Sequence, residues 1–337
     1  MSCVSIFLRI FEQVAEFYPN QLTQGAESFR HGSLVAFPTE TVYGLGADAT
    51  NAQAVARIYE VKGRPTNHPL IVHIARFKYL DQWISYIPEY AITLSQAFWP
   101  GPMTLILRRS ELAKDFITGG QDTIGIRIPD NLIALGLLEA FHDIGGAGVA
   151  APSANRFGQV SPTTAAAVKD ELGDYLAATD LVLDGGPSTV GLESTIIDCT
   201  GKLPRILRPG AITIAMIEEV TGLRVSDSSE LKSEEIKFKD IRVSGSLENH
   251  YSPKAKVFLD QQPVFGSGFI ALSDIETPAG VTRLAAPKTI EEFARVIYSA
   301  LRAGDHQNLD SIYIAQPTGD GLAIAIRDRL SRSAKGR

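Results

Sequence analysis

The sequence predicts an α/β protein of two domains, and three observations support this. From Ser33 onward, short β-rich runs alternate with stretches of helical periodicity, which is typical of a sheet covered by helices. The chain has 337 residues, 45% of them hydrophobic, and at roughly 150 residues per domain this length favours two domains. A polar stretch without a sustained apolar period, 224–255, interrupts the pattern. We therefore expect domains at 20–220 and 256–337, joined by a linker at 221–255.

The first domain contains eight apolar runs that we interpret as strands or strand ends: SLVAFP, LIVHI, MTLILR, TIGIRIP, GVAAPSAN, LVLDGG, STIIDCT and RILRPG. Between them lie helical stretches at 51–62, 88–99, 131–141 and 163–172. The first helix is well specified, with Asn51 as its N-cap and Gly63 as its stop. Because the strands end in loops that carry hydroxyl, amide or arginine side chains, we expect several strand ends to build one site.

The second domain shows the runs KVFL, GFIALS and LDSIYIA and the helical stretches TIEEFARVIYSALRAG and GLAIAIRDRLSRSA. This order predicts a small doubly wound domain. At the other end of the chain, Arg9 and Glu12 break the apolar run of MSCVSIFLRIFEQVAEFYP too early for a signal sequence or a membrane span. We expect a short amphipathic helix there.

Composition limits the classes of function. A net charge of −6 provides no overall field that attracts nucleic acid or an anionic membrane, so any nucleic-acid role needs a local basic patch. The two cysteines, Cys3 and Cys199, are far apart and have no CxxC spacing, which indicates neither a disulfide framework nor a zinc site. A reducing, cytoplasmic setting is expected.

Two glycines raise the question of a nucleotide site. Gly44-x-Gly46-x-x-Ala49 matches the dinucleotide fingerprint, but that motif needs its glycines where a strand turns directly into a helix. Here six residues, 38–43, separate the strand from Gly44. We interpret the glycines as a turn beside polar strand-end residues and keep a dinucleotide site as the alternative. The chain has no GxxxxGKS/T loop.

Side-chain cations from separate loops are another way to hold a phosphate, and four candidates stand out: Lys62, Arg64, Arg127 and Arg208. Lys62 and Arg64 belong to KGRPTNHPL, where two prolines exclude a helix. Arg127 lies in the apolar GIRIP, where a guanidinium is costly unless it faces a cleft or an anion. A structural ion pair is the alternative for each one, and the sequence does not show whether the four converge.

Polar residues of the strand ends have ordinary explanations as well. His73 in LIVHI fits a core histidine, and Ser153, Asn155, Ser161 and Ser194 fit caps or turns. The sequence has no GxSxG, no Cys-His pairing and no carboxylate cluster for two metals. The implied chemistry is charge stabilisation and positioning.

Taken together, seven segments in this order resemble the threonylcarbamoyl-AMP synthases with a YrdC-like domain: FPTETVYGLGADA, KGRPTNHPLIVHI, FWPGPMTLIL, TGGQDTIGIRIP, APSANRFGQVSPT, LDGGPSTVGLESTIID and ILRPGAIT. The later HYSPKAKV and DGLAIAIRDRL resemble the longer, two-domain form of that family. The resemblance implies an open twisted α/β YrdC-like domain with a concave basic cleft. It also implies a smaller Rossmann-like C-terminal domain and a linker that lies over the active site.

The resemblance also implies an activity. The family makes threonylcarbamoyl-adenylate and pyrophosphate from L-threonine, bicarbonate and ATP, which is a nucleotidyltransferase reaction. A separate tRNA threonylcarbamoyl-transferase complex then modifies the adenosine beside the anticodon. We therefore expect Mg²⁺ carried mainly by the ATP phosphates and no metal site of the protein itself. We also expect a cytoplasmic enzyme with at most a weak tRNA contact and no membrane partner.

By position, the resemblance assigns residues to the two larger substrates. It gives to ATP Lys62, Arg64, His68, Thr123, Ser153, Ser161, Arg208, His250 and Tyr251. It gives to L-threonine Thr41, His73, Arg127, Ser194 and the backbone of Ala151. Lys62 and Arg64 are expected to act in catalysis, because cations must neutralise charge that grows on the phosphates. Arg127 suits the threonine carboxylate, since a guanidinium binds a carboxylate bidentately.

The linker departs from the family pattern. Where the family reads SPGM-K/R-Y-x-HYAP, this chain has SGSLENHYSP, with Ser246, Leu247 and Glu248 in place of the methionine, the basic residue and the tyrosine. This departure predicts a weaker closure over ATP or a displaced loop.

Two other functions are alternatives. The first is an RNA-binding or ribosome-maturation module that uses the same basic cleft, although the net negative charge disfavours it. The second is a carbamoyl-transfer enzyme with a related domain. Such enzymes carry zinc-binding modules, and two cysteines cannot supply the ligands.

Overall fold

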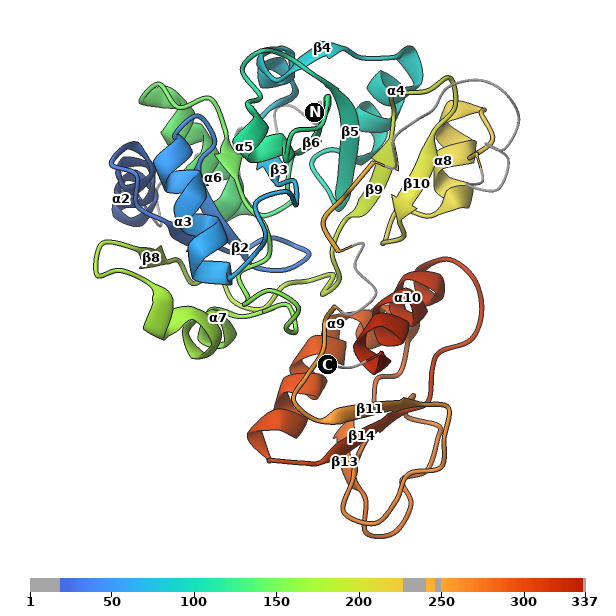
Figure 1. Cartoon of the computed structure of the whole chain (residues 1–337). Coiled ribbons are helices and arrows are strands. Elements are labelled where there is room, and N and C mark those ends of the chain that lie inside the picture. The colour runs from blue at the N-terminus through green and yellow to red at the C-terminus, as the bar shows by residue number, and fades with distance from the viewer. Residues whose placement is uncertain (1–18, 227–240, 246–249, 336–337) are drawn as a thin grey trace.

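The computed structural model describes residues 19–226, 241–245 and 250–335. It shows two α/β units, each built on its own sheet (Figure 1). The N-terminal helix that we expected over residues 1–19 lies almost entirely outside the described residues. Cys3 is also outside them. Among the described residues, no helix is both long and apolar enough to cross a bilayer.

The strands of the first unit, within the described residues, are β1 (Val35–Phe37), β2 (Gly44–Asp48), β3 (Ile71–His73), β4 (Ile84–Tyr86), β5 (Met103–Arg109), β6 (Thr123–Arg127), β7 (Val149–Ala150), β8 (Leu181–Val182), β9 (Thr195–Asp198) and β10 (Arg205–Arg208). They form one mixed sheet in the order β10-β9-β5-β6-β3-β7-β2-β1-β8, and β4 pairs with β5. All eight runs that the sequence marked contain one of these strands. β2 and β4 were not predicted.

Helices cover this sheet: α2 (Pro19–Arg30), α3 (Ala52–Lys62), α4 (Glu89–Phe98), α5 (Asp115–Thr118), α6 (Leu132–Asp143), α7 (Ala165–Leu172) and α8 (Ile214–Thr221), with 3-10 turns at Phe77–Gln82 and Gly173–Tyr175. The predicted caps of α3 are confirmed. The Asn51 side chain accepts hydrogen bonds from the Gln53 and Ala54 amides, and Gly63 ends the helix with a φ of 61°. These caps fix Lys62 and Arg64 at the C-terminal end of α3.

The interpretation of Gly44 and Gly46 as a turn is wrong. Both lie in β2, which pairs with β1 on one side and β7 on the other. A Cβ at Gly46 would lie 2.7 Å from Val149 Cγ1 and 2.8 Å from Phe37 Cε1. The glycines therefore allow neighbouring side chains to pack across a buried strand. The dinucleotide alternative is wrong for the same reason, since it requires a turn into a helix at this point.

The second unit contains the parallel strands β11 (Lys256–Leu259), β12 (Gly268–Ile270), β13 (Thr282–Ala285) and β14 (Ser311–Ile314), in the order β11-β14-β12-β13. Its helices are α9 (Ile290–His306) and α10 (Leu322–Ala334). These two helices pack against each other and lie between the sheet and the first unit (Figure 1).

The expectation of a doubly wound second domain is therefore wrong for the described residues. The connection from β12 to β13 contains no helix that could cover the other face. There Phe269 and Tyr313 are buried with Phe258, and the Arg283 guanidinium lies 5.0 Å from the centre of the Phe269 ring. The sequence did not reveal this because the hydrophobic pattern of a strand does not show what covers each face.

Candidate functional site

A small cavity of about 50 Å³ lies at the ends of several strands of the first sheet, beside the described part of the linker. Nine of the fourteen residues predicted to bind ATP or threonine line it: Arg64, His73, Arg127, Ala151, Ser153, Ser194, Arg208, His250 and Tyr251. Three of the four candidate cations thus converge on one cavity. Convergence of this kind is not explained by separate structural ion pairs.

The sheet register brings these side chains together. His73 and Arg127 are partners on the parallel strands β3 and β6, so both strands deliver a polar residue at their carboxyl ends. β9 and β10 are antiparallel neighbours, which places Ser194, just before β9, beside Arg208 at the end of β10. Residues 151–153 follow β7, the neighbour of β3. The expectation that several strand ends share a site is confirmed.

Arg64 is held in the irregular loop that follows α3. Its Nη2 donates to the Pro69 carbonyl at 2.9 Å and to Ser244 Oγ of the linker at 3.1 Å. Burial lowers the pKa of Arg64 to about 10, with a further lowering by the charge of Arg208. Arg64 therefore remains a cation at neutral pH.

Arg208 is also fully buried and braces the loop before β9. Its Nε and Nη2 donate to the Ser194 carbonyl at 3.1 and 2.9 Å, and its Nη1 donates to the Ser244 carbonyl at 2.9 Å. The Ser194 hydroxyl lies 2.7 Å from Thr104 Oγ1. Burial lowers the pKa of Arg208. Arg64 and Arg208 thus both contact Ser244, which the sequence did not mark as a site residue.

Arg127 retains unused donors. Its Nη2 lies 2.6 Å from Glu40 Oε1, an ion pair between two buried side chains that lacks hydrogen-bond geometry. Among the described residues, Nε and Nη2 of Arg127 find no hydrogen-bond acceptor. A buried guanidinium with free donors beside a cavity is suited to receive an anion. Glu40 was missed, although a carboxylate in PTET beside an apolar strand was a visible signal.

The two histidines of the cavity are neutral at pH 7. Burial, assisted by the charge of Arg127, lowers the pKa of His73 to about 3. Burial also lowers the pKa of His250 to about 3, in the neighbourhood of Lys62, Arg64 and Arg208. Each therefore offers neutral imidazole nitrogens, and Nδ1 of both lacks a hydrogen-bond partner among the described residues.

Lys62 does not line the cavity. Its Nζ donates to the carbonyls of Ser153 and Asn155 at 2.6 and 2.5 Å. Burial, with a contribution from Arg64, places its pKa well below the usual range of a lysine. In this conformation Lys62 fixes the loop that follows β7, and its proposed contact with phosphates stays a prediction.

Four other predicted residues also lie off the cavity. The Thr41 and Ser161 hydroxyls each contact a residue of its lining, Thr39 Oγ1 at 2.8 Å and Glu193 Oε1 at 2.6 Å. Thr123 begins β6 whereas Arg127 ends it, so about 13 Å of strand separates them. His68 packs edge-on against Phe157, with ring centres 5.3 Å apart. The structure places none of the four in the lining, and their roles stay predictions.

Eight further residues of the lining were not predicted as site residues. They are Thr39, Val42, Gly44, Ile71, Pro152, Glu193, Ser244 and Gly245. Glu193 is the only carboxylate among the described lining residues, and its pKa is lowered to about 2 by Arg329 and Arg208 against the cost of burial. The sequence could have marked it, because a glutamate precedes the Ser194-Thr195 pair.

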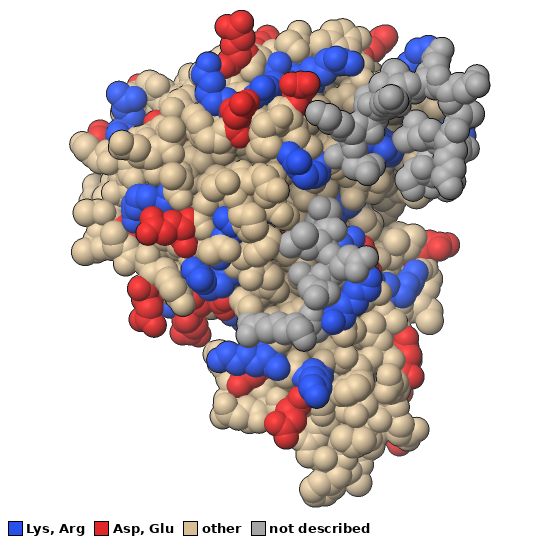
Figure 2. Space-filling model, in the orientation of Figure 1, with Lys and Arg blue, Asp and Glu red and all other residues tan. Residues whose placement is uncertain are grey.

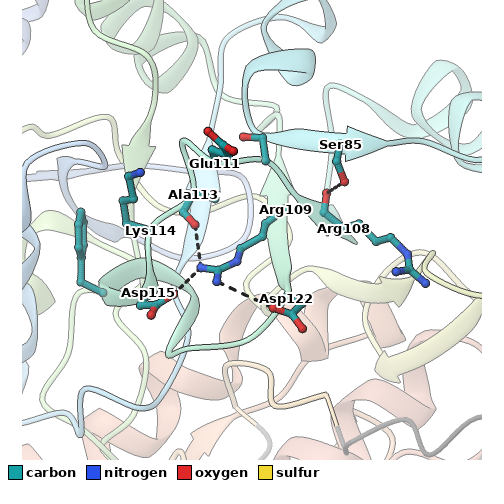
Figure 3. A pocket seen from close by; sticks show the side chains of 10 residues that line it. Ser85, Arg108, Arg109, Glu111, Ala113, Lys114, Asp115 and Asp122 are labelled. Carbon is teal, nitrogen blue, oxygen red and sulfur yellow. Dashed lines mark hydrogen bonds and ion pairs between the residues drawn. The ribbon is translucent and has the colours of Figure 1, made fainter.

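A larger groove of about 830 Å³ lies elsewhere, beside β4 and β5 (Figure 3). None of the predicted residues lines it. Its Arg109 donates to Asp115 Oδ1 at 2.6 Å and to the Ala113 carbonyl at 3.0 Å, so its central guanidinium is already paired. On the visible face of the molecule, cations and carboxylates are interspersed (Figure 2).

Fold and site together define a class of protein. A buried cavity walled by arginines, neutral histidines and hydroxyls, at strand ends of a mixed sheet, is a site for a small anionic ligand.

Comparisons with known proteins give the particular family. Residues 27–210 match the family model described as "Telomere recombination", and residues 212–335 match "Threonylcarbamoyl-AMP synthase, C-terminal domain". The chain is 36% identical to the threonylcarbamoyl-AMP synthase of Pyrococcus abyssi, over 98% of both chains. It is 38% identical to that of Bacillus subtilis, over 94% of both. The crystal structure of P. abyssi Sua5 complexed with L-threonine superposes with a TM-score of 0.81 at 38% identity, covering 93% of this chain and 94% of that one. The chain belongs to the threonylcarbamoyl-AMP synthase family.

Proposed function

We propose that this enzyme condenses L-threonine, bicarbonate and ATP into threonylcarbamoyl-AMP with release of pyrophosphate, and that it is a nucleotidyltransferase. The observation that carries the proposal is the convergence of Arg64, Arg127 and Arg208 on one buried cavity, with unused donors on Arg127. Family membership gives the identity of the substrates.

Arg127 binds the carboxylate of threonine in this proposal. Its Nε and Nη2 have no hydrogen-bond acceptor among the described residues, although Nη2 lies 2.6 Å from Glu40 Oε1, and together they form the fork that a carboxylate accepts bidentately. His73 is the residue of β3 that pairs with Arg127 of β6. Because its imidazole is neutral, it hydrogen-bonds the substrate without adding charge. Ser194, which also lines the cavity, offers its hydroxyl.

Arg64 and Arg208 bind the phosphates. The unprotonated threonine amine forms a C–N bond with CO₂, one C=O π bond opens and the nitrogen loses a proton, which gives a carbamate. With bicarbonate, the same C–N bond forms while a C–O bond breaks and water leaves. A carbamate oxygen then forms a bond to the α-phosphorus while the bond from that phosphorus to the pyrophosphate oxygen breaks. Negative charge accumulates on the leaving pyrophosphate, and two fixed guanidinium groups in a buried site stabilise it. Lys62 supports this arrangement by holding the Ser153 and Asn155 carbonyls.

ATP enters only when the linker moves. The cavity of about 50 Å³ is far smaller than the ~300–1,000 Å³ of a typical ligand pocket. Ser244, Gly245, His250 and Tyr251 form its linker side, so these residues must be displaced by the nucleotide. Ser246, Leu247 and Glu248, on which we based the expectation of weaker closure, lie outside the described residues.

Mg²⁺ enters with ATP, on phosphate oxygens and water. Among the described residues there is no group of three or more His, Cys, Asp or Glu side chains that could hold a metal ion. The product passes to a tRNA threonylcarbamoyl-transferase complex in the cytoplasm. We expect at most a weak contact with tRNA itself, since the net charge of the chain is −6.

The test is a single incubation of the purified enzyme with ATP, L-threonine and labelled bicarbonate. We expect pyrophosphate release that requires all three substrates, together with a labelled adenylate. Pyrophosphate release that ignores threonine and bicarbonate would reject the proposal. Salt-sensitive binding of RNA without turnover would instead favour the RNA-binding alternative.

A further inference from the structure

The carboxylate of Glu193 lies in the cavity wall and is fully occupied by hydrogen bonds. Its Oε1 accepts from Ser161 Oγ at 2.6 Å, and its Oε2 accepts from the Tyr298 hydroxyl at 2.9 Å and from Arg329 Nε at 2.9 Å. Tyr298 belongs to α9 and Arg329 to α10, so two of the three donors come from the second unit. The second unit thus reaches a wall of the cavity that lies in the first.

Arg329 penetrates deeply to make this contact. Its side chain is 1% exposed. Its Nη2 donates to the Pro209 carbonyl at 2.9 Å, and its Nη1 donates to Asp328 Oδ2 at 2.5 Å. The guanidinium also lies 5.4 Å from the centre of the Tyr251 ring, which lines the cavity from the linker. Burying a guanidinium so completely is costly unless its nitrogens find partners, and Arg329 finds two in the first unit, Glu193 and Pro209, and one on its own helix, Asp328.

The charge of Glu193 matters because the proposed ligand is a polyanion. A buried carboxylate in the wall repels a triphosphate. It also attracts Arg208, whose Nε and Nη2 are held by the carbonyl of Ser194, the residue that follows Glu193. When Arg329 pairs with Glu193, the second unit compensates this negative charge, and Arg208 stays hydrogen-bonded to Ser194 in the cavity wall.

We propose that Arg329 is a positioning residue for ATP: by pairing with Glu193 from the C-terminal unit, it keeps the Arg208 guanidinium on Ser194 in the cavity wall, where its charge attracts the phosphates. The inference rests on the proposed function and gives the C-terminal unit a role in that reaction. The competing explanation is that Arg329 only docks one unit on the other.

Arg302 provides a matched control for the explanation that Arg329 only holds the two units together. Arg302 of α9 also crosses from the second unit to the first, where its Nη1 donates to Glu171 Oε2 at 3.0 Å and its Nη2 donates to the Val160 carbonyl. Neither Glu171 nor Val160 lines the cavity. Arg302→Gln therefore removes an inter-unit ion pair without changing the charge of the cavity wall.

The experiment measures binding of ATP and of L-threonine by calorimetry, together with pyrophosphate release and thermal unfolding, for the full chain. We expect Arg329→Gln to weaken ATP binding by about tenfold or more, because Glu193 is left uncompensated, and to change threonine binding less than about threefold. Arg302→Gln should change both affinities by less than about threefold. The double variant Glu193→Gln/Arg329→Gln removes both charges and should bind ATP within about threefold of the unaltered enzyme.

Three outcomes would overturn the inference. They are equal weakening by Arg329→Gln and Arg302→Gln, parallel losses of ATP and threonine affinity, and failure of the double variant to recover ATP binding. If Arg329→Gln does not fold, the double variant decides, since it must bind ATP within about threefold of the unaltered enzyme. Absence of threonine-dependent pyrophosphate release in the unaltered enzyme would reject the proposed function, whereas the ATP-binding comparison would still decide this inference.

Discussion

Arg127 offers the sharpest test of the site, and the change we consider is Arg127→Gln. In the structure, Arg127 Nη2 lies 2.6 Å from Glu40 Oε1, and the two side chains are 6% and 3% exposed. If the guanidinium binds the threonine carboxylate, its loss removes two charge-assisted hydrogen bonds worth about 1.5–3 kcal/mol each. Allowing for the weaker bond that glutamine still makes, we expect a loss of about 2–4 kcal/mol, a roughly 30- to 1,000-fold rise in the KM for threonine. The KM for ATP should rise less than about threefold.

The same substitution also affects stability, because Glu40 becomes a buried carboxylate without a partner. We expect the free energy of unfolding to fall by about 3–5 kcal/mol. The double variant Glu40→Gln/Arg127→Gln removes both charges and separates the two effects. It should recover most of the lost stability and none of the threonine affinity.

The assay follows pyrophosphate release while threonine is varied at saturating ATP, and then ATP at saturating threonine, with urea unfolding of each variant alongside. Equal rises in both KM values would refute the assignment of Arg127 to threonine. Recovery of threonine affinity in the double variant would also refute the assignment. It would show that threonine binding needs only the removal of the unpaired Glu40 charge and not the two hydrogen bonds of the Arg127 guanidinium.

Three further predictions concern the supports of the site. Lys62→Met leaves two buried loop carbonyls without their ammonium donor and should lower the unfolding free energy by about 1–3 kcal/mol in urea titrations; unchanged stability would contradict this role. His73 and His250 have a pKa of about 3 in the folded protein against 6.5 ordinarily, so the unfolded chain takes up protons first as the pH falls. The unfolding free energy should therefore drop as the pH falls below 6.5, by up to about 1.4 kcal/mol per pH unit for each histidine. His250→Gln should remove the contribution of one histidine from that slope, and an unaltered slope would contradict the prediction. Gly46→Ala forces a methyl group against the neighbouring strands and should cost about 1–3 kcal/mol, whereas Gly173→Ala, with no atom within 4 Å, should change stability by less than about 1 kcal/mol; equal effects would refute the packing argument.

The secondary structure of the first unit was largely predictable from local signals. α3 is the clearest case, because Asn51 and Gly63 specify both ends through contacts within a few residues. β2 was missed because glycine is typical of turns, so the sequence around Gly44 and Gly46 indicated a turn rather than a strand. Their place in a strand depends on the side chains of Phe37 and Val149, which pack against them from other strands.

The site was predictable in its composition and less so in its geometry. Arg64, Arg127 and Arg208 were recognised as cations in unusual local settings, and the structure brings all three to one cavity. Glu40 and Glu193 were missed: each stands beside polar strand-end residues in the sequence, but the arginine that pairs with it is distant in the chain and is identified only by the structure. Lys62 was recognised, but the carbonyls that hold its ammonium lie 91 and 93 residues away.

The sequence by itself determined which segments become helices and strands, which residue types line the site, and which family the ordered motifs resemble. These properties depend on local periodicity, on caps and on the chemistry of single side chains. Only the tertiary structure decided that Arg329 of the last helix compensates Glu193 in the wall of a cavity belonging to the other unit. The physical reason is that a buried charge is stable only with a partner, and partners 136 residues apart meet through packing of the two units.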